Sequence, residues 1–101
     1  MKSQAKQGKN ADYGLYEAIQ AIKTAKEAKD FFQDLCTPAE IQAMADRWRV
    51  VEPLKMGKSY RQIYDATGVS VTTIGRVARY IMSGVGYNLI YDRVKNKGKS
   101  K

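Results

Sequence analysis

Apolar side chains recur at three- and four-residue spacing along most of the chain, and no stretch alternates with period two over a useful length. This pattern predicts an all-α protein. In the N-terminal half it predicts a helix that starts at Asp12 and a second, shorter helical segment after it. The apolar positions that carry these two elements are Leu15, Ala18, Ile19, Ile22 and Ala25, then Phe31, Phe32 and Leu35.

The stretch "TPAE" at 37–40 is a strong signal for the start of a central helix. Thr37 can cap the helix, Pro38 suits the first helical position, and Glu40 completes a capping box. The apolar pattern then continues towards Gly57, which predicts the end of the helix. Pro53 lies within this stretch and would remove a backbone hydrogen bond, so we expect a kink or an early end there.

Two short helical patterns flank a glycine in "SYRQIYDATGVSVTTIGRVARY" at 59–80. Ser59 and Gln62 have the spacing of a capping box, Gly68 suits the end of the first helix, and Ser70 can cap the second. Two helices joined by a short turn with glycine predict a helix-turn-helix. The inner face of its second helix carries Ile74, Val77, Ala78 and Ile81.

The remaining segments set the expected domain boundaries. After "SGVG" the pattern predicts a last helix, "YNLIYDRV", that packs through Leu89, Ile90 and Val94. Residues 1–11 and 96–101 are basic and lack apolar periodicity, so we expect a disordered arm and a disordered tail. The folded domain then spans residues 12–95.

The outer face of the second helix of the helix-turn-helix, at about 70–82, is polar and basic. A helix of this kind fits the major groove of DNA, where arginine can pair with guanine for about 1–3 kcal/mol of discrimination and threonine can contact thymine. A glycine inside the helix costs about 1 kcal/mol relative to alanine, which is tolerated more readily where another molecule must approach the backbone. This face presents Thr72, Thr73, Gly75, Arg76 and Arg79. Near the first helix, Arg61 can reach a phosphate or a flanking base, and Ser59 with the helix N-terminus suits a phosphate.

Charge is distributed unevenly. Residues 1–52 hold eight basic and eight acidic side chains, whereas residues 53–101 hold ten basic side chains and two acidic ones, so the second half carries the whole net charge of +8. Such asymmetry indicates an anionic partner, most often nucleic acid. The alternative is a solvated surface with a solubilising tail.

Other functional classes find little support. One cysteine and no histidine exclude a disulfide framework and a Cys/His zinc site. The acidic residues do not cluster as a carboxylate pair, so we expect no enzyme, and no cofactor is indicated. Neither a signal peptide nor an apolar run of membrane-spanning length is present, which predicts a cytoplasmic protein without a membrane partner.

From end to end, "DLCTPAEIQAMADRWRVVEPLKMGKSYRQIYDATGVSVTTIGRVARY" resembles the Trp repressor family, and "FFQDLCTPAEIQA" with "GYNLIYDRV" makes it more similar to the YerC/YecD-like branch. The resemblance covers residues 12–95. It implies a six-helix subunit, an intertwined homodimer that binds double-stranded DNA, and two recognition helices about 34 Å apart on a palindrome. It implies that the DNA-facing residues are Arg61, Val71, Thr72, Thr73, Gly75 and Arg76.

The resemblance also bears on a small-molecule effector. Thr37, Arg47 and Arg76 stand where the tryptophan-responsive members place two arginines and a threonine of their ligand site. Val77 and Tyr80 stand where those members have a glycine and a serine, and these larger side chains would occupy the indole slot. We therefore expect that tryptophan is not the ligand. A different effector, or none, stays open.

Three hypotheses for function follow. The first is a sequence-specific transcriptional regulator, a repressor by the resemblance. The second is an architectural DNA-binding protein with little base discrimination, whose affinity comes from the tails. The third is an adaptor whose Thr/Arg face meets an acidic protein. Selection between target and random duplexes separates the first two, and weak DNA binding would favour the third.

Overall fold

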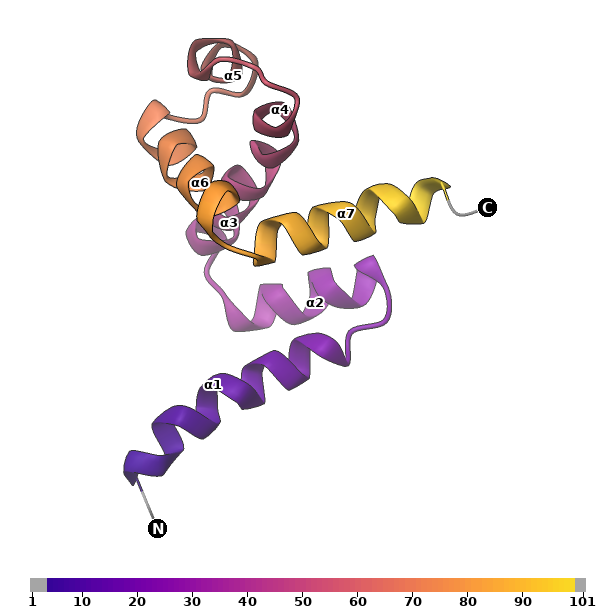
Figure 1. The fold of residues 1–101 in the computed structure, drawn as a ribbon. Helices are drawn as coiled ribbons and strands as arrows, with labels where there is room; N and C mark the ends of the chain where they lie inside the picture. Colours follow the sequence, from indigo (N-terminus) through magenta and orange to yellow (C-terminus); the bar gives the residue numbers. More distant parts are fainter. Residues whose placement is uncertain (1–3, 100–101) are drawn as a thin grey trace. The chain divides into compact units, whose positions relative to one another are not determined.

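The computed structural model describes residues 4–99, and this part of the chain is helical without any strand, so the all-α prediction is confirmed (Figure 1). Its helices are α1 (Gln4–Gln20), α2 (Ala25–Leu35), α3 (Pro38–Arg49), α4 (Val51–Lys55), α5 (Tyr60–Thr67), α6 (Val71–Ser83) and α7 (Gly86–Lys99). The chain divides into two compact units between Ile41 and Gln42, within α3. None of the helices over residues 4–99 combines the length and apolar character that crossing a bilayer requires.

The first unit departs from the predicted boundaries. α1 begins at Gln4, which corrects the expected disordered arm for residues 4–11; residues 1–3 lie outside the described part of the chain. Gln, Ala and Lys are good helix formers, so the helix extends beyond the apolar pattern. α1 also ends at Gln20, before Ile22 and Ala25, the last apolar positions of the pattern that predicted this helix. Thr24 starts a new helix there, because its hydroxyl accepts a hydrogen bond from the N–H of Glu27 at 3.1 Å.

The start of α3 is formed as the sequence predicts. The N–H of Thr37 donates to Oε1 of Glu40 at 2.8 Å, and the N–H of Glu40 donates to the Thr37 hydroxyl at 3.1 Å. These reciprocal bonds make the predicted capping box and satisfy two backbone donors that have no partner within the helix.

The central helix is interrupted, as the position of Pro53 predicted. α3 ends at Arg49 and α4 begins at Val51, so the six predicted helices appear as seven helical segments over residues 4–99. Pro53 is the third residue of α4. An N–H at this position has no carbonyl partner within the helix, so the missing donor of proline costs little there.

The core of the second unit gathers around this interruption. Its buried residues come from the break, from α5, from the following turn and from α6. They are Val50, Val51, Ile63, Val69, Ile74 and Val77. These contacts hold α5 and α6 against α4, and they therefore set the geometry of the helix-turn-helix.

α7 packs through a different face from the one we expected. Tyr87 and Tyr91 are the α7 residues that pack against the core, whereas Leu89, Ile90 and Val94 are 49%, 45% and 55% exposed. Leu89, Ile90 and Val94 therefore stay about half-exposed in the subunit, and their packing stays a prediction. α7 also continues to Lys99, which corrects the expected disordered tail for residues 96–99; residues 100–101 lie outside the described part.

Candidate nucleic-acid interface

The helix-turn-helix is held together by local hydrogen bonds. The Ser59 hydroxyl accepts from the N–H of Gln62, and the Ser59 N–H donates to Oε1 of Gln62, which completes the predicted capping box of α5. Gly68 ends α5 with a φ of 77°, in the left-handed region that glycine adopts without steric cost. The helix ends are therefore defined by residues that the sequence had marked.

The turn between α5 and α6 is fixed by two further residues. The Thr67 hydroxyl donates to the carbonyl of Ile63 at 2.7 Å and accepts from the N–H of Val69 at 3.1 Å. Val69 is buried beneath the turn, as predicted. The Ser70 hydroxyl then caps α6 by accepting from the N–H of Thr73 at 3.2 Å. Together these contacts orient the first turn of α6 relative to α5.

An open groove follows the outer face of α6. It contains six of the eight residues that we predicted to contact DNA, and it adds one residue each from α3 and α5. The lining residues are Arg47, Tyr60, Val71, Thr72, Thr73, Gly75, Arg76 and Arg79. Tyr60 and Arg47 were not predicted on this surface, because their side chains reach the groove only through the tertiary structure of the second unit.

The groove is positively charged. It holds the guanidinium groups of Arg47, Arg76 and Arg79, and within the described part of the chain none of the three forms an ion pair. The arginines that do pair, Arg49 with Asp46 and Arg61 with Asp65, lie outside the groove lining. The uncompensated charge along α6 suits a polyanion such as the backbone of DNA.

Gly75 is not required by packing within the subunit. A Cβ at this position would meet Cε2 of Tyr60 at 3.7 Å, which is ordinary van der Waals contact. The helix therefore tolerates a glycine that costs about 1 kcal/mol relative to alanine without an internal steric reason. The position leaves the backbone of α6 open to a molecule that enters the groove.

Two predicted contact residues, Ser59 and Arg61, lie outside the groove lining. The Ser59 N–H already donates to Gln62 and the Ser59 hydroxyl accepts from the Gln62 N–H, so the donor that Ser59 can offer a phosphate is its hydroxyl proton and not its N–H. The Arg61 side chain is 83% exposed, and its Nε lies 3.4 Å from Oδ1 of Asp65. Arg61 would exchange this exposed partner for a phosphate at little cost, since such surface pairs contribute little to stability.

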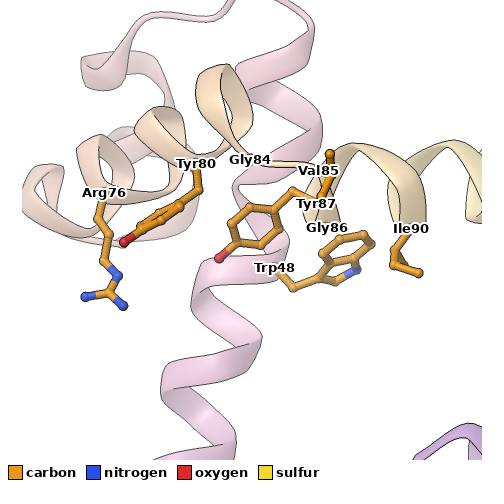
Figure 2. Close-up of a pocket in the computed structure, with 8 residues that line it drawn as sticks. All are labelled: Trp48, Arg76, Tyr80, Gly84, Val85, Gly86, Tyr87 and Ile90. Carbon is orange, nitrogen blue, oxygen red and sulfur yellow. The ribbon is translucent and has the colours of Figure 1, made fainter. Parts of the chain in front are cut away.

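Within the second unit, the predicted effector residues Arg47, Arg76, Val77 and Tyr80 do not line a single site. Arg76 and Tyr80 line an apolar pocket of about 600 Å³ (Figure 2). Arg47 and Arg76 line the groove. Val77 is fully buried in the core and lines neither site, and the Thr37 side chain is engaged by Glu40. The pocket residues are Trp48, Arg76, Tyr80, Gly84, Val85, Gly86, Tyr87 and Ile90. The sequence analysis did not single out the stacked pair of Trp48 and Tyr87, whose ring centroids are 6.4 Å apart.

Two short helices, a turn closed by a left-handed glycine and a basic groove along the second helix define a helix-turn-helix protein. Residues 13–94 match the family model of the Trp repressor protein. The chain therefore belongs to the Trp repressor family.

Individual relatives agree with this assignment. The chain is 42% identical over 89 residues to the uncharacterized protein YerC of Bacillus subtilis (strain 168), with 87% of this chain and 85% of YerC covered. Its fold is similar to a TrpR-like protein from Eubacterium eligens ATCC 27750, with a TM-score of 0.80, 37% identity, and coverage of 85% of this chain and 90% of that one. It is also similar to a candidate Trp repressor from Staphylococcus aureus, with a TM-score of 0.81, 34% identity, and coverage of 93% and 96%. Family membership indicates a DNA-binding regulator of a non-enzymatic class.

Proposed function

We propose that the chain is a sequence-specific transcriptional regulator, a repressor, that binds double-stranded DNA as a homodimer with α6 in the major groove. The observation that carries this proposal is the basic groove along α6, which gathers three arginines with the polar face of the helix. A helix of this width fits the major groove, and its first turns then meet the base edges.

The residues of the groove divide into two roles. Arg76, with Thr72 and Thr73 on the preceding turn, reads base edges, because arginine can bind guanine through two hydrogen bonds and threonine can contact thymine. Arg47 and Tyr60 come from neighbouring helices and flank α6, which suits them to phosphate contacts that set the register of the protein on the duplex.

The homodimer is supported by large apolar side chains that the subunit leaves exposed. α7 exposes Leu89, Ile90 and Val94, and α1 exposes Leu15 and Ile19 by 37% and 39%. Exposed apolar surface of this kind marks an interface, and a two-fold axis presents the same surface on both subunits. A symmetric dimer would place two α6 helices about 34 Å apart, one helical turn of DNA.

We also propose that tryptophan is not an effector of this chain. Val77 occupies core space beneath α6, and the Tyr80 ring stands beside Arg76, where a flat ligand would need room. Adding tryptophan should therefore leave the affinity for DNA unchanged. A tryptophan-dependent gain in affinity would contradict this proposal.

The test is selection of the purified protein on a pool of random duplexes at near-physiological salt, followed by sequencing. We expect a palindrome with half-sites about one helical turn apart. Arg76→Ala should lose the preference at one position in each half-site. Arg93→Ala is the matched control, because Arg93 is an exposed arginine of α7 outside the groove and its removal should keep the preference. An enriched site that is unchanged by Arg76→Ala would refute the base-reading role.

A second candidate is weakly specific architectural binding. It is favoured by the exposed basic side chains of α7, Arg93, Lys95 and Lys97, which would contact phosphates without reading bases. Under this alternative the protein retains the pool of duplexes but enriches no sequence. A pool that is not retained would favour a protein partner instead.

A further inference from the structure

Arg76 and Tyr80 form a contact on the surface of α6 that belongs to both the groove and the pocket. Arg76 lines both sites, and Tyr80 lines the pocket only. The Arg76 guanidinium carbon lies 5.8 Å from the centroid of the Tyr80 ring, within the range of a cation–π interaction. Figure 2 shows the two side chains leaving α6 on the same side, one turn apart.

The surroundings of Arg76 give this contact its importance. Among the described residues no carboxylate pairs with Arg76, and the groove holds two further guanidinium groups, those of Arg47 and Arg79. Like charges that line one groove repel one another, so the charges of the groove do not hold the Arg76 side chain over α6. The negative face of the Tyr80 ring is the described group that attracts it.

A side chain that is already ordered before binding contributes more to the affinity for DNA than one that must lose its mobility on binding. An arginine that reads a base must give up its rotamer freedom on binding, and ordering it beforehand removes part of this cost. Tyr80 is 50% exposed and belongs to a helix that is anchored in the core through Ile74 and Val77. It therefore offers a fixed surface against which Arg76 can be ordered before DNA arrives.

We propose that Tyr80 is a positioning residue for Arg76: its ring holds the guanidinium at the groove in the orientation that reads a base. This proposal rests on the proposed function, because it assumes that Arg76 reads DNA. It also means that the group that orders Arg76 is part of the chain, so the purified protein discriminates between sequences without an added small molecule.

The experiment measures the affinity for the selected duplex and for the same duplex changed at the base pair that Arg76 reads. Tyr80→Leu keeps the bulk and removes the ring, so it should lower the ratio of the two affinities about two- to fivefold per half-site. Tyr80→Phe keeps the ring and should preserve the ratio. Tyr64→Leu is the matched control, a half-exposed tyrosine on α5 outside the groove lining, and should also preserve it.

A double-mutant cycle separates positioning from a structural role. In the Arg76→Ala background, Tyr80→Leu should have no further effect on the ratio, since the group that it positions is gone. Melting temperature and elution volume check that the variants fold, and Tyr80→Met replaces Tyr80→Leu if the latter does not.

Several results would overturn the proposal. They are an unchanged ratio in Tyr80→Leu, an equal loss in Tyr80→Phe, and a loss that persists without Arg76. If the wild-type protein shows no base preference, the proposed function fails and the positioning role fails with it. A wild-type preference that survives Tyr80→Leu refutes the positioning role alone.

Discussion

Replacing Gly75 with alanine should raise the stability of the subunit and weaken its binding to DNA. The added Cβ meets Cε2 of Tyr60 at 3.7 Å, so the fold accommodates it without displacing a neighbour. Alanine is favoured over glycine inside a helix by about 0.8–1 kcal/mol. A gain of this size should raise the melting temperature by roughly 4–8 °C in a domain of this length.

The same methyl group stands in the groove, where the duplex must approach the backbone of α6. An extra methyl group in a close-packed contact costs about 1–3 kcal/mol, so the affinity for the selected duplex should fall by about 5- to 150-fold. The two effects therefore have opposite signs, which a general loss of folding could not produce.

Circular dichroism during heating and fluorescence anisotropy with the labelled duplex measure the two quantities. Gly14→Ala in α1 is the matched control, because it makes the same change inside a helix with nothing within 4 Å of the new Cβ. It should stabilise α1 and leave DNA binding unchanged. Unaltered affinity in Gly75→Ala would refute the close approach of DNA at this position, and a lower melting temperature would refute the steric argument.

Three further changes test the core, the dimer and the charge. Ile74→Ala removes a fully buried side chain and should lower the free energy of unfolding by about 2–5 kcal/mol in urea titrations; a smaller decrease would show that the core collapses around the change. Ile90→Asp places a charge on the exposed face of α7 and should yield monomers in light scattering. A persistent dimer would show that the dimer interface lies on another surface. Lys97→Gln should reduce the slope of log K against log salt by about 0.9 for each phosphate that the protein no longer neutralises. The reduction should be equal for selected and random duplexes. A change in base preference would contradict a role limited to phosphates.

The start and end of several helices could be predicted because the signals are local. The reciprocal bonds of Thr37 with Glu40 and of Ser59 with Gln62 join residues three apart, and the left-handed Gly68 acts within its own turn. Such interactions depend on a few neighbouring residues and on no distant part of the chain. The helix-turn-helix and the polar face of α6 follow from them and from the apolar period.

The extent of the terminal helices was harder to predict. The sequence shows no apolar period before Asp12 or after residue 95, yet α1 begins at Gln4 and α7 continues to Lys99. Apolar periodicity reports the face that a helix buries, whereas helix formation also depends on backbone propensity, which is high for the Gln, Ala and Lys residues near the start of α1.

The amino-acid order thus established the all-α class, the caps, the helix-turn-helix and the concentration of positive charge in residues 53–101. It did not identify the face of α7 that packs against the core: we expected Leu89, Ile90 and Val94, but "YNLIYDRV" carries apolar side chains on more than one side, and packing selected Tyr87 and Tyr91. The sequence also left undecided that Arg47 joins the groove. Those outcomes depend on how separate helices pack against one another, since a side chain's partners across helices are set by the close packing of the whole core.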